Sequence, residues 1–473
     1  MYIIEIMKRI WIKDTVNNID KPVKVAGWVH SIRTHGKIIF LDLRDMTGLL
    51  QVVLTQDLAK NIKPEWVVEV EGKISLRPVN MLNPKIETGK IELPAARLLI
   101  LNEAKLLPFS VDGDGYDISE ERRMKYRYLD LRRPRLKRNL IERHRVIEFI
   151  RDFLKKEKFI EIETPILTKS TPEGARDFVV PSRLQPGNFY ALPQSPQQYK
   201  QLLQVAGLER YFQIARCFRD EDPRADRQAE FTQLDLEMSF IEQEDVIQLI
   251  EKMFIDLVKK HYPQKIIQEI PFPRITYQEA MAKYKIDRPD IRKDKNNKDL
   301  LAFCWVVDFP FFEKDEDPSA DGKWTFTHNP FSAPKPEFMQ DLLNKKNIKN
   351  ILTTQYDIVL NGFEIGGGSI RNHKAQALES VFEIIGYKKQ EIREKFGHML
   401  GAFEYGAPPH GGIASGLDRF LAIILNEESI REVIAFPKTG DSRDLMMDSP
   451  AQISEKQLKE VGIKLDKTKR RRK

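Results

Sequence analysis

A short run of charged residues joins two apolar segments near the middle of the chain. Residues 217–240 read CFRDEDPRADRQAEFTQLDLEMSF, and the apolar run Tyr211–Ala215 precedes them. The charges are concentrated at Arg219, Asp220, Glu221, Asp222, Arg224, Asp226 and Arg227. Because arginine binds phosphate in bidentate fashion and carboxylates hold magnesium, this composition suits a triphosphate and its metal. A solvated hairpin with weak surface ion pairs is the alternative interpretation.

Two further carboxylates flank an apolar run. Asp357 and Glu364 are seven positions apart, which would place them on opposite faces of one regular strand. A turn at Asn361–Gly362 would split the run into a hairpin whose arms can converge. Such an oxygen-rich pair suits magnesium that bridges phosphates. The glycines at 366–368 would then let the backbone approach a ligand closely.

The surrounding segments must position these groups. The charged loop is predicted to join a strand to an antiparallel strand, in which Phe231, Leu234, Leu236 and Met238 partly alternate with Thr232, Gln233, Asp235 and Glu237. From Asn139, apolar residues recur at helical spacing up to Leu154 and predict a helix with one buried face. A strand entry containing Pro165 follows this helix.

The first 105 residues are typical of a small β-barrel. Five segments rich in Val, Ile and Leu are separated by Gly, Asn or Pro turns, at 23–31, 38–44, 49–54, 67–75 and 91–100. An OB-fold is the leading candidate, and such barrels stack single-stranded bases on aromatic side chains beside basic groups. Residues 106–138 form a connector rich in arginine, which could follow an RNA backbone or form a solvated helix face.

Composition narrows the class of protein. A chain of 473 residues implies at least two domains, and 41% hydrophobic with 31% charged residues fits a soluble globular protein. We expect no membrane span, and the two cysteines, Cys217 and Cys304, argue for a reducing cytoplasm. Residues 464–473 hold seven bases and one acid, so they supply +6 of the net charge of +7. We expect the tail, 451–473, to be disordered, as an RNA-binding or a solubilising extension.

Several long motifs in order resemble class II aminoacyl-tRNA synthetases, and specifically the bacterial-type aspartyl enzymes. These are YLDLRRP at 128–134, TPEGARDF at 171–178, QSPQ at 194–197, EIGGGSIR at 364–371 and GLDR at 416–419. The resemblance implies an α+β chain with an N-terminal OB-fold β-barrel and a catalytic domain (139–450) built on an antiparallel sheet flanked by helices. The usual inserted domain is absent near 285–300.

The resemblance also implies chemistry in two steps, without a protein nucleophile. ATP and aspartate would form aspartyl-adenylate, and a terminal tRNA hydroxyl would take the aspartyl group, so catalysis rests on positioning and charge. The cationic clamp would be Arg219 and Arg419. The expected ATP contacts are Arg219, Glu221, Gln228, Glu364, Gly416, Leu417, Asp418 and Arg419, and Asp357 with Glu364 would hold Mg²⁺.

The amino-acid pocket implied by the same motifs selects by charge. Arg371 and Lys200 would pair with the side-chain carboxylate of aspartate, with Asp235 ordering them. The full expected set is Glu173, Ser195, Gln197, Lys200, Arg219, Asp235, His328 and Arg371. Asn329 replaces a second histidine often found beside His328, which leaves that contact open.

The implied partners are L-aspartate, tRNA(Asp) and a second copy of the chain, held through the predicted helix and strand after 139. Arg33, His35, Phe40 and Gln51 would contact the anticodon. In the resembled family, a histidine at the position of His35 often occurs in enzymes that also charge tRNA(Asn). We therefore expect relaxed tRNA specificity, that is, charging of both tRNA(Asp) and tRNA(Asn). An asparaginyl or lysyl enzyme is the first alternative, against which Arg371 and Lys200 argue. A non-catalytic RNA-binding relative is the second, against which the triphosphate clamp argues.

Overall fold

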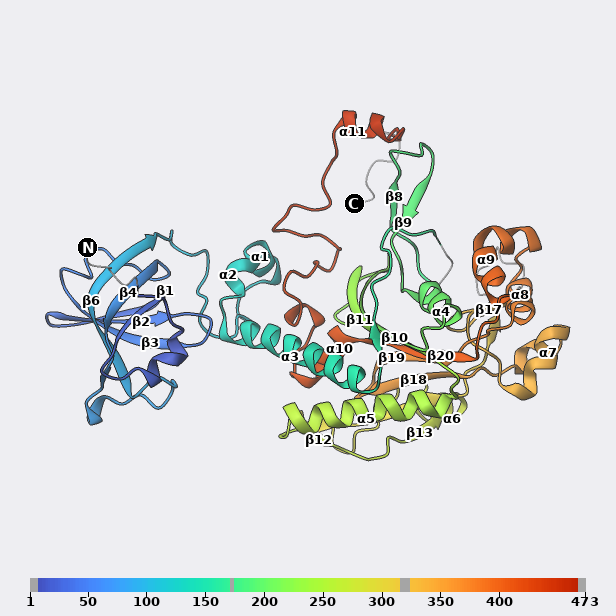
Figure 1. Cartoon of the computed structure of the whole chain (residues 1–473), viewed down its shortest axis with the longest axis horizontal. Helices are drawn as coiled ribbons and strands as arrows, with labels where there is room; N and C mark the ends of the chain where they lie inside the picture. Colours follow the sequence, from blue (N-terminus) through green and yellow to red (C-terminus); the bar gives the residue numbers. More distant parts are fainter. Residues whose placement is uncertain (1–6, 171–173, 315–323, 467–473) are drawn as a thin grey trace. The chain divides into compact units, whose positions relative to one another are not determined.

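The computed structural model describes residues 7–170, 174–314 and 324–466 and divides into two compact units, 1–110 and 111–473 (Figure 1). The first unit contains η1 Ile12–Asn17, β1 Pro22–His35, β2 Ile38–Arg44, β3 Leu49–Thr55, β4 Val67–Lys73, β5 Ser75–Leu76, η2 Val79–Met81 and β6 Ile91–Asn102. The strand order is β3-β2-β1-β4-β6-β5, and a parallel pairing of β3 with β6 closes the sheet. This closed barrel confirms the predicted OB-fold.

Alternation along the strands of the barrel separates its core from its surface. Val23, Val25 and Val29 of β1 are buried with residues of β2, β3, β4 and β6. The neighbouring positions therefore point outward, as expected for a pleat of period two. The outward face of β1, β2 and β3 is the one that carries the predicted anticodon residues.

The second unit is built on an eight-stranded, mostly antiparallel sheet. Its order is β13-β15-β18-β19-β20-β11-β10-β7. The strands are β7 Ile160–Glu161, β10 Arg210–Phe218, β11 Glu230–Ser239, β13 Arg274–Thr276, β15 Phe303–Val307, β18 Gln355–Leu360, β19 Phe363–Ile370 and β20 His410–Gly416. Smaller pairs are β8 Val179–Pro181 with β9 Phe189–Ala191, β12 Ile266–Ile267 with β14 Leu300–Leu301, and β16 Phe312–Lys314 with β17 Trp324–Phe326.

The second unit also contains helices. They are α1 Glu120–Lys125, α2 Arg127–Asp130, α3 Pro134–Lys156, α4 Gln197–Val205, α5 Gln243–His261, α6 Tyr277–Tyr284, α7 Met339–Asn344, α8 Ala375–Ile384, α9 Lys389–Phe403, α10 Leu417–Ile424 and α11 Glu455–Glu460, with 3-10 turns η4 Pro336–Phe338, η5 Ile348–Asn350 and η6 Ile430–Glu432. Buried residues of α3, α5 and α10 form one core with the sheet. Helix α4 packs on β11 and on α9. No helix among the described residues has the length and apolarity to cross a bilayer.

Strand β11 has two different faces, and both are buried. Leu234, Leu236 and Met238 join the core formed with α3 and α5. Gln233, Asp235 and Glu237 alternate with them and are at most 9% exposed. Because successive side chains point to opposite sides of a strand, the polar set is presented on the face away from this core.

Two segments differ from the sequence-based expectation. Helix α3 begins at Pro134 rather than at Asn139, because proline at the first helical position lacks only an amide hydrogen that needs no partner there. Residues 451–473, expected to lack regular structure, include α11, whose N-terminus is capped by Ser454. The described residues between α6 and β14 form no regular element, at the place where an inserted domain was expected to be missing.

Three arginines of the connector, Arg123, Arg127 and Arg133, are buried. They can therefore neither follow an RNA backbone nor form a solvated helix face. The carboxylate of Asp130, 0% exposed, accepts from Arg127 at 2.9 Å, from Arg123 at 3.0 Å and from Arg133 at 2.7 Å. Glu432 accepts from Arg123 at 2.7 Å. These arginines therefore hold α1, α2 and the start of α3 to the segment after α10.

We predict that Asp130→Asn destabilises the second unit by about 3–5 kcal/mol, because removing one charge leaves three buried guanidinium groups without their shared acceptor. Equilibrium unfolding in urea measures this loss. Glu157→Gln is the control, since the Glu157–Lys252 pair is exposed and should contribute less than about 1 kcal/mol. We call Asp130, Arg123, Arg127, Arg133 and Glu432 the Asp130 cluster. Equal unfolding midpoints for the two variants would contradict a structural role for this cluster.

Candidate active site

Two buried cations and two buried carboxylates meet beside β11. Lys200 Nζ lies 2.8 Å from Asp235 Oδ2 and 3.3 Å from Glu237 Oε2. Arg371 donates through Nε to Glu237 Oε1 at 2.8 Å and through Nη2 to Glu237 Oε2 at 3.1 Å. The four residues are at most 2% exposed. We call Lys200, Asp235, Glu237 and Arg371 the ion-pair cluster.

Each cation of this cluster keeps donor capacity for a ligand. Among the described residues, Arg371 also donates to Ser369 Oγ and to the Gly412 carbonyl oxygen, so four of its five N–H groups are used. Lys200 uses two of its three N–H groups on Asp235 and Glu237. One donor from each cation therefore remains for an incoming carboxylate.

The electrostatics of the two carboxylates differ. Burial raises the pKa of Asp235 above its usual value, although Lys200 acts in the opposite direction. In the part of the chain that the structure describes, Asp235 Oδ1 has no hydrogen-bond partner. Burial acts in the same sense on Glu237, but Arg371 and Lys200 outweigh it and hold the pKa of Glu237 below its usual value. Sequence reasoning missed Glu237. Its position two residues after Asp235 on one strand face was the signal that could have found it.

Three members of the ion-pair cluster, Lys200, Asp235 and Arg371, line a polar pocket. The pocket is lined by Ser195, Gln197, Lys200, Arg219, Gln233, Asp235, His328, Asn329, Phe331, Gln355, Glu364, Gly367, Gly368, Arg371 and Ala414. The structure thus brings together every residue predicted for the amino acid except Glu173, which lies outside the described residues. Gln233, Asn329 and Gln355 were not predicted. Asn329 Nδ2 donates to Gln355 Oε1 at 3.3 Å, so it belongs to the polar wall.

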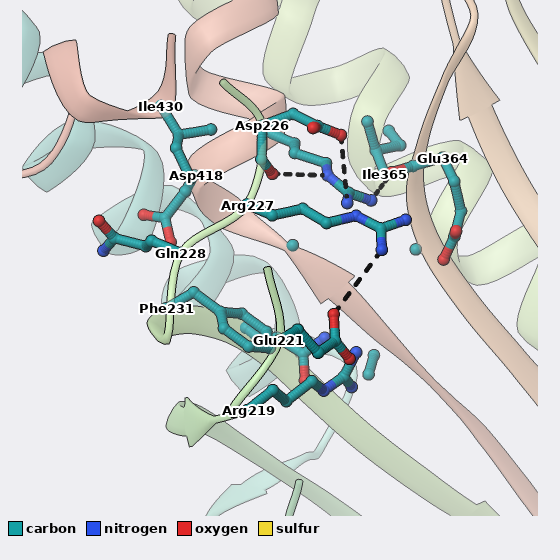
Figure 2. Close-up of a pocket in the computed structure, with 15 residues that line it drawn as sticks. Arg219, Glu221, Asp226, Arg227, Gln228, Phe231, Glu364, Ile365, Asp418 and Ile430 are labelled. Atoms are coloured by element: carbon teal, nitrogen blue, oxygen red, sulfur yellow. Dashed lines mark hydrogen bonds and ion pairs between the residues drawn. The ribbon is translucent and has the colours of Figure 1, made fainter. Parts of the chain in front are cut away.

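A second pocket adjoins the first and holds most residues predicted for ATP (Figure 2). It is lined by Arg219, Glu221, Asp226, Arg227, Gln228, Phe231, Gln233, Glu364, Ile365, Gly366, Ala414, Gly416, Asp418, Arg419 and Ile430. Arg219, Gln233, Glu364 and Ala414 line both pockets. Leu417 does not line either pocket but is buried in the core formed with α3 and α5. Asp226 and Arg227 belong to the charged loop predicted to suit a triphosphate but were not among the individual ATP contacts, and Phe231 was not predicted for this site.

Arg219 is placed to act on a ligand that spans both pockets. Its guanidinium carbon lies 5.1 Å from the ring centre of Phe231, a cation–π contact that fixes its plane. The Nε atom is buried and has no hydrogen-bond partner among the described residues. Unpaired buried donors are rare because they forgo the hydration of the group, so this atom marks a place for an acceptor.

Arg419 combines a structural and an electrostatic role. It donates through Nη1 to the Glu364 carbonyl oxygen at 2.8 Å and through Nε to the Asp226 carbonyl oxygen at 3.2 Å, and Nη2 lies 3.3 Å from Asp226 Oδ2. These bonds tie α10 to β19 and to the charged loop. Burial lowers the pKa of Arg419 from its usual value, but a guanidinium remains charged in proteins.

Two residues predicted to contact ATP, Asp418 and Gln228, have side chains that form hydrogen bonds within the protein. Asp418 Oδ2 accepts from the Thr232 amide at 2.9 Å, while Oδ1 accepts from Arg143 of α3. Gln228 Nε2 donates to the Glu230 carbonyl oxygen at 2.6 Å, and its Oε1 accepts from the Lys438 amide at 3.2 Å. Both side chains shape the pocket wall through these bonds. Glu221, in contrast, forms a loose ion pair with Arg227, in which the nitrogen and oxygen atoms are 3.7 Å apart.

Asp357 and Glu364 are brought together by the predicted hairpin of β18 and β19. Asn361 and Gly362 form its turn at φ 52° and 86°. Burial and the nearby Glu364 raise the pKa of Asp357 well above its usual range. Glycine at position 367 leaves room for this carboxylate, because a Cβ there would lie 2.7 Å from Asp357 Oδ1 and would displace it. No group of three or more potential ligands for a metal occurs among the described residues, so these two carboxylates would need substrate oxygens to complete a site.

The predicted anticodon residues share the outward face of the barrel. Arg33 pairs directly with Phe40, and the neighbouring pair Asp42–Gln51 continues the same face. Phe40 is half-buried and His35 is exposed at the end of β1. Gln51, however, is 7% exposed and donates to Glu92 Oε2 at 2.8 Å. Asp42, which was not predicted, forms an ion pair with Arg33 at 3.0 Å.

Comparisons with known proteins agree with this geometry. Residues 119–440 match the family of class II tRNA synthetases (D, K and N), and residues 23–94 match the OB-fold nucleic acid binding domain. An aspartate–tRNA(Asp/Asn) ligase of Dictyoglomus turgidum is 42% identical, with 95% of this chain and 96% of the relative aligned. A ligase of the same name from Caldanaerobacter subterraneus is 40% identical, with 95% and 97% aligned.

The alignments and the solved structures add two facts. The 577 aligned positions of the Dictyoglomus turgidum comparison exceed the 473 residues of this chain by 104, so that relative contains residues which this chain lacks. Asparaginyl-tRNA synthetase of Pyrococcus horikoshii, solved with asparaginyl-adenylate, superimposes with a TM-score of 0.72 at 23% identity, over 92% of this chain and 99% of that one. By family match, identity and coverage, the chain belongs to the class II aminoacyl-tRNA synthetases of the aspartate, lysine and asparagine group.

Proposed function

We propose that this chain is an aspartate–tRNA ligase that activates L-aspartate with ATP and transfers it to tRNA(Asp) and to tRNA(Asn). The observation that carries the proposal is the ion-pair cluster, in which buried Lys200 and Arg371 line the polar pocket and each keep one donor that is unused among the described residues. The names of the relatives, which are aspartate–tRNA(Asp/Asn) ligases, support both the amino acid and the two tRNAs.

The pocket favours aspartate over the other two amino acids of the group. A side-chain carboxylate can accept from both remaining donors, whereas the amide of asparagine offers one oxygen and a competing NH₂ group. The ammonium group of lysine would face two buried cations. Leaving a buried charged donor unpaired costs about 1–3 kcal/mol or more, so pairing of this kind discriminates strongly.

In the first step, an α-carboxylate oxygen of aspartate attacks the α-phosphorus of ATP, and the bond to pyrophosphate breaks. Arg219 lines both pockets, so we place it between the reacting carboxylate and the α-phosphate, where its unpaired Nε donates to the charge that develops. Arg419 supports the distal phosphates. In the second step, a terminal ribose hydroxyl of tRNA attacks the aspartyl carbonyl, and AMP leaves.

Asp357 and Glu364 fit a role in holding Mg²⁺ with the phosphates. Two converging carboxylates, one with a pKa raised by burial and by its neighbour, gain stability when a cation binds between them. A bound Mg²⁺ would neutralise phosphate charge and orient the pyrophosphate leaving group.

The proposal includes a homodimer in a cytoplasmic setting. The segment that follows α3 exposes Ile160, Ile166 and Leu167, which are 48–53% exposed, and we propose that a second copy covers them. Among the described residues, Cys217 and Cys304 form no disulfide, as in proteins of a reducing compartment.

ATP–pyrophosphate exchange with aspartate, asparagine and lysine supplied separately tests the proposed activation. We expect exchange with aspartate alone. Exchange with asparagine or lysine would show that the ion-pair cluster does not select the amino acid. No exchange with any of them would favour the alternative of an RNA-binding relative without activity. Charging of purified tRNA(Asp) and tRNA(Asn) in matched assays then tests relaxed specificity, and failure with tRNA(Asn) would contradict it.

Arg219→Ala should lower kcat for exchange by about 100-fold or more, because one preorganised donor to the transition state is lost. Stability should change little, since the Arg219 side chain has no ion pair among the described residues. Arg216→Ala is the matched control, because Arg216 lies near the end of β10, three residues before Arg219, and its pair with Glu230 is largely exposed. A similar loss of kcat in both variants would contradict a specific role of Arg219.

Asp357→Asn should raise the melting temperature of the ligand-free enzyme at pH 8 by about 2–4 °C while lowering exchange activity. Folding raises the pKa of Asp357, so its ionised form destabilises the folded chain at pH values above that pKa. The neutral amide avoids this effect and still accepts from Gln355 Nε2, which lies 2.7 Å from Asp357 Oδ1. The gain should shrink as the pH falls, and a gain that is independent of pH would be inconsistent with this origin.

A further inference from the structure

A buried histidine lies behind the amino-acid pocket without lining it. His410 is the first residue of β20 and is 0% exposed. Its ring makes an edge contact with Phe403 at 6.2 Å and lies 6.4 Å from the ring of His373. The predicted site did not include His410, and neither substrate-binding pocket reaches it. Its hydrogen bonds, however, lead to a residue that does line the pocket.

The surroundings of His410 select one tautomer. The Nδ1 atom lies 2.8 Å from the Pro408 carbonyl oxygen, which can only accept, so Nδ1 carries a hydrogen. Burial lowers the pKa of His410, and it outweighs the opposing effects of Glu237 and of the hydrogen bond to the Pro408 carbonyl oxygen. Arg371 and His373 act in the same direction as burial. The ring is therefore neutral, and its Nε2 atom is an acceptor.

This tautomer orients two glutamines in turn. Gln201, 0% exposed, lies 3.1 Å from His410 Nε2 and must offer its amide nitrogen there. Its Oε1 then faces α4 one turn earlier, where it accepts from Gln197 Nε2 at 3.0 Å. The Gln197 oxygen is thereby left for the amino-acid pocket, which Gln197 lines beside Ser195 and Lys200. We call His410, Gln201 and Gln197 the amide relay.

Reversing the relay would reverse what the pocket offers. A protonated His410 would donate through Nε2 and require the oxygen of Gln201. Gln201 would then turn its NH₂ group toward Gln197, which would present its own NH₂ group to the ligand. An ammonium group can donate to an amide oxygen but is repelled by an amide NH₂ group.

We propose that His410 and Gln201 are positioning residues which hold the Gln197 side-chain oxygen toward the α-ammonium group of the amino acid. The inference rests on the proposed function, because it takes an amino acid as the ligand of this pocket. Gln197 is three positions before Lys200 on α4, so it faces the same ligand one helical turn away from the group that binds the side-chain carboxylate.

Three variants test the relay by ATP–pyrophosphate exchange. Gln201→Leu breaks it, and the KM for aspartate should rise about five- to tenfold with the KM for ATP unchanged. Gln201→Glu keeps an oxygen toward Gln197 and should stay within about twofold of the parent KM. Gln204→Leu is the matched control, because Gln204 is also buried on α4 but accepts from Ser239 Oγ, at 2.6 Å, outside the relay.

Competitive inhibition by succinate, which is aspartate without its ammonium group, distinguishes a loss of the contact to the ammonium group from a general disruption of the pocket. The inhibition constant of succinate should be the same in Gln201→Leu as in the parent enzyme. An unchanged KM for aspartate in Gln201→Leu, an equal rise in Gln204→Leu, or parallel weakening of succinate would overturn the relay. If the parent enzyme shows no exchange with aspartate, the proposed function fails instead, so the two failures are distinguishable.

Discussion

The site depends on one electrostatic arrangement, the pairing of two buried cations with two buried carboxylates beside β11. Lys200 lies on α4, and Arg371 directly follows β19. Asp235 and Glu237 hold the two cations side by side. Cations of this kind would repel each other and lose hydration if they were buried alone. The carboxylates offset that cost and still leave donors free, so a charged pocket exists before any ligand arrives.

This arrangement requires that one face of β11 packs in the hydrophobic core while the other face carries the ionic side chains. Leu234, Leu236 and Met238 join the core with α3 and α5, which fixes β11 in the sheet. The intervening polar residues then have no freedom to point elsewhere, because the side chains of a strand alternate strictly. The position of the pocket is therefore set by hydrophobic packing on the opposite face, and its rigidity follows from the burial of both faces.

Close packing of neighbouring strands extends the same constraint. A Cβ at Gly412 would lie 2.0 Å from the Leu236 carbonyl oxygen, and one at Gly368 would lie 2.2 Å from the Gly412 carbonyl oxygen. The glycines of β19 thus serve strand packing as well as access for a ligand. Arg419 and Asp418 connect α10 to the charged loop and to α3, so the two pockets share one rigid frame.

Sequence patterns alone were sufficient to predict the elements that are determined by residues close to one another in the chain. The alternation after Phe231, the Asn361–Gly362 turn and the β-rich first 105 residues each follow from nearby residues, and the motifs pointed to Arg219, Arg419, Lys200 and Arg371. Tertiary structure decided which polar groups are already paired. Glu237, the amide relay and the Asp130 cluster join residues up to 309 positions apart. Hydrogen-bond partners at that separation are set by the packing of the sheet and its helices, and no local pattern encodes them.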